Sequence, residues 1–468
     1  MKNLIIFFLV LSINASAVVW QVGSTHTYTL PSQVSMLVQN GDTVDIDAGN
    51  YPSDVCRWQA NNLLLRGVGG FAQLESNGLS WGDKAIWVIQ GNNCVVEWTE
   101  FMECTSTSQN GAGIRQEGLN LTVRHCYFHD NEDGILGGAY SPCKVTIEYC
   151  EFNHNGYGDG YSHNLYIGHI DTLVFRYNYS HHCHIGHELK SRAHVNYILY
   201  NRISNETTGD ASREIDLPNG GLTFIIGNEI EQGPVSTNSN IIGYGLEGLT
   251  NQDSILYVVN NSIVNDRSNG SFLSLQSGTS LCKAYNNIFA GPGTIISGTA
   301  TTLDTANNFY STVSNTGFVN APAYDYRLLS SSGAINGGTN PGFANIFSLS
   351  PVYEYVHPVN MTNRIANGQL DIGAHEYGTN AAVNFPDENN SVIKIYPNPS
   401  AGVFEITGDK KMEAVTVTDI YGRIVFVKTG IASDKFMVML NDNEGRFNFV
   451  SVKYADKTFS FGKITVQK

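Results

Sequence analysis

The sequence predicts an all-β chain whose body is a right-handed parallel β-helix, and an internal repeat is the first observation behind this prediction. A β-rich run followed by a polar or cysteine residue, a variable residue and an apolar or small residue recurs along the middle of the chain. The repeats start at Cys126, Cys150, Asn178, Asn201, Asn228, Asn261 and Asn287. These starts are 24, 28, 23, 27, 33 and 26 residues apart, as expected for coils whose turns carry insertions.

Composition and periodicity are the second and third observations. The chain of 468 residues contains 47 glycines and only 15% charged residues, which suits many short strands joined by turns. Apolar residues alternate before the repeat starts, so one face of each strand is expected to point into the bore. The asparagines that start five repeats are predicted to form a ladder of side-chain amides, with Cys126 and Cys150 stacking as small buried residues.

The first residues predict export. Residues 1–17 combine a positive start, an apolar run and the cleavage site Ala15-Ser16-Ala17 of a signal peptide. The mature protein is therefore expected in an oxidising compartment, where disulfides are permitted but not required. The formal net charge of −15 and the lack of a basic stripe exclude a nucleic-acid partner, and a monomer is expected.

The limits of the β-helix rest on resemblance. The strand-like runs at 41–51, 63–65 and 94–96 resemble the opening coils of pectate-lyase-like β-helix proteins. The segments at 325–328, 334–338 and 371–377 resemble the closing segment of secreted β-helix proteins of the Bacteroidetes. Together they imply a β-helix over residues 18–378, followed by a polar linker at 379–393.

The end of the chain resembles a second family. Ile395-Tyr396-Pro397-Asn398-Pro399-Ser400, followed by Val415-Thr416-Val417-Thr418-Asp419 and Tyr421-Gly422-Arg423, is similar to the C-terminal sorting domain of type IX secretion substrates. The resemblance implies a small β-sandwich over residues 394–468 and the type IX secretion machinery as a partner. Residues 443–447 depart from the usual turn of that family.

Candidate functional residues gather in three consecutive coils. Ten of the 13 histidines lie between His125 and His194, and the richest polar segments are 163–167, 187–192 and 212–219. If Leu165, Leu189 and Ile215 point inward, alternation places a set of polar residues outward on neighbouring coils about 4.8 Å apart. That predicted patch consists of Asn164, Tyr166, Glu188, Lys190, Glu214 and Asp216, beside His163, His187, Arg192 and Asn219. The next coil is expected to add Tyr244 and Glu247 as further substrate-binding residues, beside Gln232 in the preceding loop.

This patch suits β-elimination of a uronate polysaccharide. The reaction needs a group that neutralises the sugar carboxylate, a base for the C5 proton and an acid for the leaving oxygen. Lys190 is the predicted base, because its neighbour Arg192 disfavours a second positive charge. Tyr166 or His187 is the predicted proton donor. Glu188, Glu214 and Asp216 are predicted to bind Ca²⁺, a hard cation that prefers oxygen ligands.

The same stretch resembles a lyase family. Glu188-Leu189-Lys190-Ser191, with Asn196, Asn201, Gly209 and Arg213, is similar to the lysine-to-arginine stretch of the chondroitinase B and alginate lyase family. The resemblance implies Lys190 as base, Arg213 as acid and a nearby Ca²⁺. It also departs from the family, because the interval between the two residues is slightly longer. Arg213 lies two residues before Ile215, so strict alternation would point its side chain inward, like that of Ile215, unless the strand starts after Arg213.

Other readings of these residues stay open. A lysine beside glutamate on a β-helix is often only a solvated ion pair. Two carboxylates among Glu188, Glu214 and Asp216 would instead suit a glycoside hydrolase. A long solenoid also suits a non-catalytic glycan-binding or adhesive protein, with extracellular polysaccharide as the partner in every case. Arg115 can reach a bound anionic sugar, although a structural role is favoured.

Overall fold

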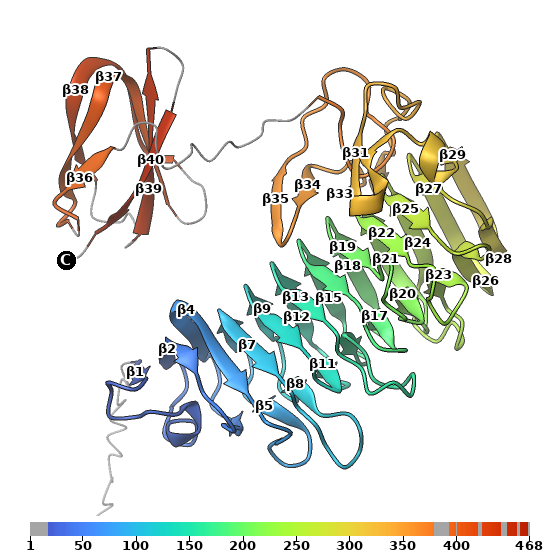
Figure 1. Cartoon of the computed structure of the whole chain (residues 1–468), viewed down its shortest axis with the longest axis horizontal. Helices are drawn as coiled ribbons and strands as arrows, with labels where there is room; N and C mark the ends of the chain where they lie inside the picture. The colour runs from blue at the N-terminus through green and yellow to red at the C-terminus, as the bar shows by residue number, and fades with distance from the viewer. Residues whose placement is uncertain are drawn as a thin grey trace, which may run out of the picture. The chain divides into compact units, whose positions relative to one another are not determined.

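A computed structural model describes residues 17–378, 393–398, 400–419, 424–440, 447–455 and 459–466. The chain divides into two compact units, Met1–Thr379 and Asn380–Lys468 (Figure 1). The predicted signal peptide and linker lie almost entirely outside the described residues. Among the residues that are described, no helix is long and apolar enough to span a membrane.

The first unit is a parallel β-helix in which each coil contributes a strand to three sheets, here called A, B and C. Sheet A contains β1 (Val19–Val22), β2 (Thr43–Asn50), β4 (Leu64–Glu75), β6 (Val95–Glu97), β9 (Thr122–Arg124), β12 (Lys144–Glu148), β15 (Thr172–Arg176), β18 (Val195–Leu199), β21 (Gly221–Ile226), β24 (Ser254–Val259), β26 (Ser271–Tyr285) and β28 (Thr294–Ala306). Sheet B contains β7 (Thr99–Met102), β10 (Tyr127–His129), β13 (Glu151–Asn153), β16 (Tyr179–His181), β19 (Arg202–Ser204), β22 (Glu229–Gln232), β25 (Ser262–Asn265), β27 (Ile288–Ala290) and β29 (Phe309–Ser311). Sheet C contains β3 (Cys56–Trp58), β5 (Ala85–Ile89), β8 (Ala112–Gln116), β11 (Asp133–Gly137), β14 (Leu165–Ile167), β17 (His187–Ser191), β20 (Arg213–Leu217) and β23 (Asn240–Tyr244), and the first parts of β26 and β28 continue it.

The register confirms the repeat. Each residue that follows a repeat start pairs with its counterpart in the next coil, so that Tyr127 pairs with Glu151 and Glu151 with Tyr179. This pairing continues through sheet B to β27. The irregular intervals therefore arise in the turns, while the strands keep one register.

The predicted asparagine ladder is present in the bore. The side-chain amide of Asn178 donates to Asn201, and the same bond joins each asparagine to the next through Asn287 at 2.9–3.2 Å. Asn308 extends the ladder by one further coil. Cys126 and Cys150 hold the equivalent positions in earlier coils, where the Cys126 backbone N–H donates to the Cys150 Sγ. All eight cysteines are buried and free.

Sheet C departs from strict alternation, and this departure decides where the polar side chains lie. Two consecutive residues of several strands pack into the same apolar bore, as Ile86 and Trp87 do in β5 and Ile241 and Ile242 do in β23. Residues one position before such a pair, such as Ala85, belong to a separate cluster on the outer face. Several coils of sheet C therefore turn two neighbouring side chains inward before alternation resumes.

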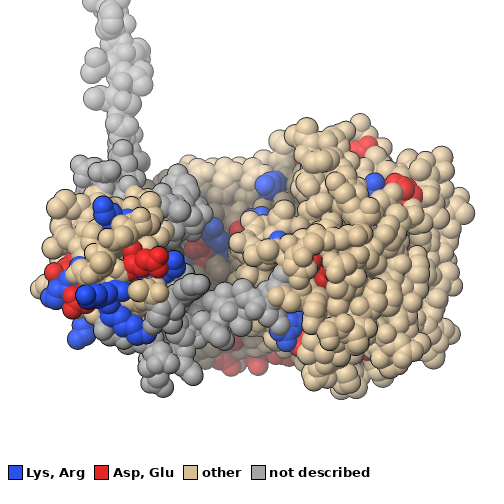
Figure 2. Space-filling view, turned by 90° about the horizontal axis from the view of Figure 1, so that it is seen from above, with Lys and Arg blue, Asp and Glu red and all other residues tan. Residues whose placement is uncertain are grey.

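Charged side chains are sparse on the outside of the β-helix. On the part of its surface that Figure 2 shows, most residues are uncharged and the charged side chains are few.

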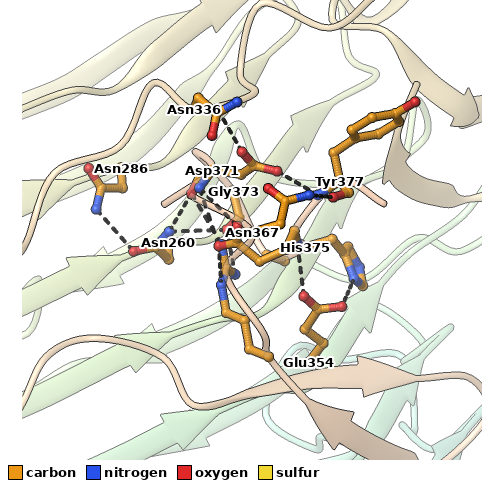
Figure 3. Close-up of polar contacts among 12 residues, drawn as sticks. Asn260, Asn286, Asn336, Glu354, Asn367, Asp371, Gly373, His375 and Tyr377 are labelled. Carbon is orange, nitrogen blue, oxygen red and sulfur yellow. Dashed lines mark hydrogen bonds and ion pairs between the residues drawn. The ribbon is translucent and has the colours of Figure 1, made fainter. Parts of the chain in front are cut away.

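A C-terminal segment closes the β-helix. It contains η2 (Val313–Asn315), β30 (Phe318–Asn320), η3 (Ala321–Ala323), β31 (Asp325–Leu328), β32 (Phe343–Ala344), β33 (Phe347–Ser348), β34 (Tyr353–Val356) and β35 (Asn360–Asn363), whereas η1 (Pro31–Gln33) lies near the start of the chain. The predicted closing motif 371–377 is fastened to the coils through Asn260, whose amide donates to the carbonyl oxygens of Asp371 and Gly373 (Figure 3). The Asp371 carboxylate in turn accepts the backbone N–H groups of Asn336 and Tyr377.

His375 in this segment makes the stability of the closure depend on pH. Its ring lies between Glu229 of β22, at 2.5 Å, and Glu354 of β34, at 3.4 Å. Burial alone would lower the pKa of His375, but hydrogen bonds and charge from the two glutamates raise it to about 9. A raised histidine pKa stabilises the folded state fully below the unfolded value near 6.5, and this stabilisation is lost as pH rises through 9.

We therefore expect the free energy of unfolding of the wild-type β-helix to fall between pH 7 and 10. In the His375→Gln variant the fall should be smaller, because glutamine does not titrate. Urea denaturation at several pH values measures both slopes. Equal slopes for the two proteins would contradict the assigned charge on His375.

The second unit is a small antiparallel β domain. Its strands are β36 (Lys394–Tyr396), β37 (Val403–Asp419), β38 (Ile424–Met439), β39 (Phe447–Tyr454) and β40 (Phe459–Thr465). The strands share one antiparallel sheet in which β37 pairs with β36, β38 and β39. Their alternating apolar residues enclose a core of their own, which includes Phe404, Val415 and Val450. The predicted motif 421–423 lies outside the described residues.

Candidate functional site

The outer face of sheet C carries two neighbouring columns of polar side chains. Registered pairing stacks Leu136, Tyr166, Lys190 and Asp216 on successive strands from β11 to β20. Beside them stand His163, His187 and Arg213, of which His187 pairs with Arg213. The rings of His163 and His187 are stacked 4.8 Å apart. Four consecutive coils thus bring these groups together.

An ion-pair network joins these columns. The Lys190 Nζ lies 3.6 Å from the Asp216 Oδ2 and 3.2 Å from the Glu247 Oε1. Arg192 reaches the other Glu247 oxygen at 2.6 Å, and Arg213 reaches the Asp216 Oδ1 at 3.0 Å. Three cations therefore share two carboxylates on a chain whose net charge is −15.

Tyr166 is positioned by the same network. The Arg192 Nε donates to the Tyr166 hydroxyl at 2.8 Å, and its Nη1 donates to Asn219 at 2.6 Å. The Lys190 Nζ lies 5.6 Å from the centre of the Tyr166 ring. A phenol that accepts a bond from a guanidinium keeps its own proton free to be donated.

Both histidines of the site are neutral. Burial lowers the pKa of His163 well below its ordinary value, and the charges of Lys190 and Arg192 lower it further. Burial, His163 and the cations likewise lower the pKa of His187. The His163 Nδ1 accepts the backbone N–H of His187, so its proton is on Nε2. The His187 Nδ1 is buried and has no hydrogen-bond partner among the described residues.

The two carboxylates differ in exposure. Burial raises the pKa of Asp216, although Arg213 and Lys190 oppose the rise. Burial also acts to raise the pKa of Glu247, but hydrogen bonds and charge from Arg192 and Lys190 outweigh it and lower the value. The side chain of Glu247 is 48% exposed, whereas that of Asp216 is 2% exposed. Glu247 is therefore the partner that an anionic ligand can displace.

Comparison with known families agrees with the two units. Residues 61–211 match the family model described as a right handed beta helix region, and residues 394–444 match the one described as a secretion system C-terminal sorting domain. The chain is a secreted right-handed β-helix protein with a type IX sorting domain. The sorting domain places the protein outside the cell or on its surface.

Solved structures similar to this β-helix protein share little sequence with it. Pectate lyase Pel9A aligns with 78% of the chain and 97% of its own, at 13% identity and a TM-score of 0.44. Pectin methylesterase PemA from Erwinia chrysanthemi aligns with 47% of the chain and 81% of its own, at 12% identity and a TM-score of 0.31. Both alignments are too loose for either activity to be carried over. None of the curated proteins compared with the sequence matches it.

The structure corrects the predicted direction of three polar residues. Asn164, Glu188 and Glu214 are fully buried and point into the bore of the β-helix protein, because each is the first of two consecutive inward residues. Asn164 ends a second internal amide ladder, which runs from Asn131 through Asn155, and it donates to the Glu188 carboxyl. Strict alternation, on which the prediction rested, does not hold at this point of sheet C.

The chemistry of these buried acids agrees with an internal role. Burial raises the pKa of Glu188 to about 8 and that of Glu214 well above its ordinary value. Glu214 accepts a hydrogen bond from the side chain of Asn205. Both glutamates are therefore protonated at neutral pH and serve the interior, where a bound polysaccharide cannot reach them.

Two predicted substrate-binding residues are also internal. Tyr244 pairs with Leu217 in the core and donates its hydroxyl proton to the Gly221 carbonyl. Gln232 lies in β22, fully buried, with its amide 3.4 Å from Glu214. Tyr244 has the same inward parity as Ile242, and Gln232 belongs to a strand instead of the predicted loop.

The predicted Ca²⁺ ligands do not form a donor set. Glu188 and Glu214 point inward, whereas Asp216 points outward and is paired with two cations. In the described part of the chain, no group of three or more histidine, cysteine or acidic side chains is arranged to hold a metal ion.

The remaining predicted residues lie together. Arg213 opens β20 and points outward, because the two inward residues of its coil are Glu214 and Ile215. The outer cluster consists of His163, Tyr166, His187, Lys190, Arg192, Arg213, Asp216, Asn219 and Glu247. Sequence reasoning missed Asp133, which stands on the same face and accepts the backbone N–H of His163. The position of Asp133 at the start of a strand, one coil before His163, was the sequence feature that could have identified it.

Proposed function

We propose that this β-helix protein is a polysaccharide lyase that cleaves a uronate-containing polymer by β-elimination on the outer face of sheet C. The observation that carries the proposal is the cluster of Lys190, Arg192 and Arg213 around two carboxylates, beside a phenol held by a guanidinium. A local excess of positive charge on an acidic protein suits an anionic substrate.

The guanidinium groups neutralise the uronate carboxylate. Arg213 takes this role instead of the acid role implied by resemblance, because a guanidinium does not release a proton in proteins. Arg192 joins it when the entering carboxylate displaces the half-exposed Glu247. Neutralising the carboxylate makes the C5 proton acidic enough to be removed.

Lys190 and Tyr166 move the protons. Lys190, acting through its neutral amine, takes the C5 proton. The electrons of the C5–H bond form the C4–C5 double bond as the C4–O bond breaks. Tyr166 then donates its proton to the leaving oxygen. Neutral His163 and His187 form an uncharged wall that does not compete for the substrate anion.

Ultraviolet absorbance of the unsaturated uronate product tests the proposal. The mature protein is mixed with polygalacturonate, alginate or chondroitin, each with added Ca²⁺ or with chelator. A rise in absorbance with at least one polymer is expected, and it should survive the chelator. Reducing ends without a rise in absorbance would indicate a hydrolase. Binding to a polymer without either product would indicate a glycan-binding protein.

The Tyr166→Phe variant tests the proton donor. We expect kcat to fall by about a hundredfold, because a positioned acid contributes on the order of 10²–10⁴ to the rate. KM should change little, since the ring remains. Tyr161→Phe is the matched control, because Tyr161 is 83% exposed on a loop outside the cluster. Equal kcat values for wild type and Tyr166→Phe would assign the proton donor elsewhere.

A further inference from the structure

The outer face of sheet C continues beyond the proposed centre with two unsatisfied polar groups. Arg115 of β8 stands in the same column as Leu136 and Tyr166. Its Nε is buried without a hydrogen-bond partner, and no ion pair holds its guanidinium among the described residues. Asp133 of β11 stands in the adjoining column, one coil before His163. Its Oδ1 accepts the His163 N–H, while its Oδ2 is buried and unpartnered.

An apolar floor connects these groups to Tyr166. Ala85, Val88, Ala112 and Leu136 pack into one cluster, with Trp81 and Tyr166 packed against it. The Arg57 guanidinium lies 4.9 Å from the centre of the Trp81 ring at the far end. The four aliphatic side chains are buried, so the partly exposed rings of Trp81 and Tyr166 are the apolar surface of this region. Aromatic faces beside a few polar groups suit the faces of sugar rings.

The unsatisfied atoms themselves point to a ligand. A buried polar atom without a partner costs free energy, so such atoms are rare unless water or a ligand completes them. The buried unpartnered Nδ1 of His187 and Nε of Arg213 stand farther along the column of Asp133. The outer face of sheet C thus carries four polar groups that each have an unpartnered atom, as expected for a surface that receives an extended polar ligand.

We infer that Arg115 forms a second subsite, which binds an anionic substituent of a sugar unit distant from the bond that is cleaved. The inference rests on the proposed function and names the part of the face that selects long polyanionic substrates. Arg115 supplies paired donors to a carboxylate or sulfate. Burial raises the pKa of the neighbouring Asp133 well above its ordinary value, so its neutral carboxyl leaves the charge of Arg115 available to a ligand.

The distance between the two subsites requires a polymer. Three coil steps separate Arg115 from Lys190, which is about 14 Å at roughly 4.8 Å per step. A substrate that lies along the solenoid axis reaches both positions, whereas the shortest cleavable oligosaccharide reaches only the one at Lys190. Arg115 should therefore affect long substrates selectively.

The Arg115→Met variant tests the inference, because methionine keeps much of the apolar stem and removes the charge. We expect kcat/KM on the polymer that wild type cleaves to fall by roughly 10- to 100-fold, the range for a lost charge-assisted hydrogen bond. On the shortest cleavable oligosaccharide, kcat/KM should stay within about twofold of wild type. Arg124→Met is the matched control, because Arg124 is ion-paired with Glu97 on sheet A, away from this face.

The outcomes separate the subsite from the proposed function. A polymer kcat/KM equal to wild type in Arg115→Met, or an equal loss on both substrates, would overturn the subsite and leave the lyase standing. If wild type cleaves no polymer, retention on immobilised polygalacturonate, alginate and chondroitin decides. Weaker retention of Arg115→Met than of Arg124→Met would support the subsite without the lyase, and equal or absent retention would overturn it.

Discussion

Replacement of Lys190 by alanine is expected to lower kcat on the uronate polymer by about a thousandfold while the protein stays folded. The expected loss follows from removing the base that takes the C5 proton, a role worth on the order of 10²–10⁴ in rate. The Lys190 side chain is 12% exposed and contacts Asp216 and Glu247, so its loss also removes one of the positive charges that neutralise these two carboxylates. Initial rates of product absorbance at saturating polymer measure the effect, and circular dichroism checks the fold.

Lys283→Ala is the matched control for Lys190→Ala. Like Lys190, Lys283 contacts a carboxylate and a tyrosine ring: its Nζ lies 3.4 Å from the Asp304 carboxylate and 4.2 Å from the centre of the Tyr285 ring. Lys283 belongs to sheet A, away from sheet C. We expect wild-type activity from this variant. A Lys190→Ala protein within about tenfold of wild type would assign the base to another group. A large loss that appears only in KM would assign Lys190 to substrate binding.

Much of the fold could be predicted because the coil leaves a local signature in the sequence. Each repeat start is a small polar or cysteine side chain that must fit the bore and bond to the coils above and below. That constraint acts at one position per coil and is independent of turn length. Asn201 and Asn228 therefore occupy equivalent places although 27 residues separate them, and the structure joins their side chains at 2.9 Å.

The candidate site was only partly predictable because alternation is not a local property of every strand. In sheet C, Glu188 and Leu189 both turn inward, which reverses the direction of every polar residue before that pair. The same departure moves Arg213 outward to Asp216. Nothing in the residues themselves distinguishes an inward glutamate from an outward one. Ala85 and Ala112, which precede the inward pair in earlier coils, lie on the outer face, but this equivalence is visible only once the register is known.

Long-range pairs lay beyond sequence reasoning for a different reason. Glu247 bonds to Lys190 and Arg192 across 57 and 55 residues, through a turn whose path depends on the insertions of two coils. Spacing placed Glu247 on the correct side of the solenoid but gave no partner. The partners matter chemically, because an exposed carboxylate that bridges two cations is the group that a uronate can replace.

The Arg364→Met variant should destabilise the β-helix by about 3–5 kcal/mol, the cost of breaking a buried ion pair. Arg364 is 1% exposed and Glu376 0% exposed in their side chains, and the guanidinium bonds to Glu376 and to the carbonyl oxygens of Gly373 and Asp371. Methionine leaves an acid and two carbonyl groups buried without these donors. Urea unfolding followed by tryptophan fluorescence measures the loss, since the five tryptophans all precede residue 99 in the β-helix unit.

Arg327→Met is the control for this closure, because Arg327 pairs with Asp325 while its side chain is 51% exposed. An exposed pair contributes about 0–1 kcal/mol, so the control should unfold close to wild type. The double variant Arg364→Met and Glu376→Leu should recover part of the loss, because it removes the buried acid that has lost its cation but does not restore the two hydrogen bonds to the carbonyl oxygens of Gly373 and Asp371. Equal stability of Arg364→Met and Arg327→Met would mean that the closing segment opens independently of the coils, and the ladder alone would then hold the β-helix together.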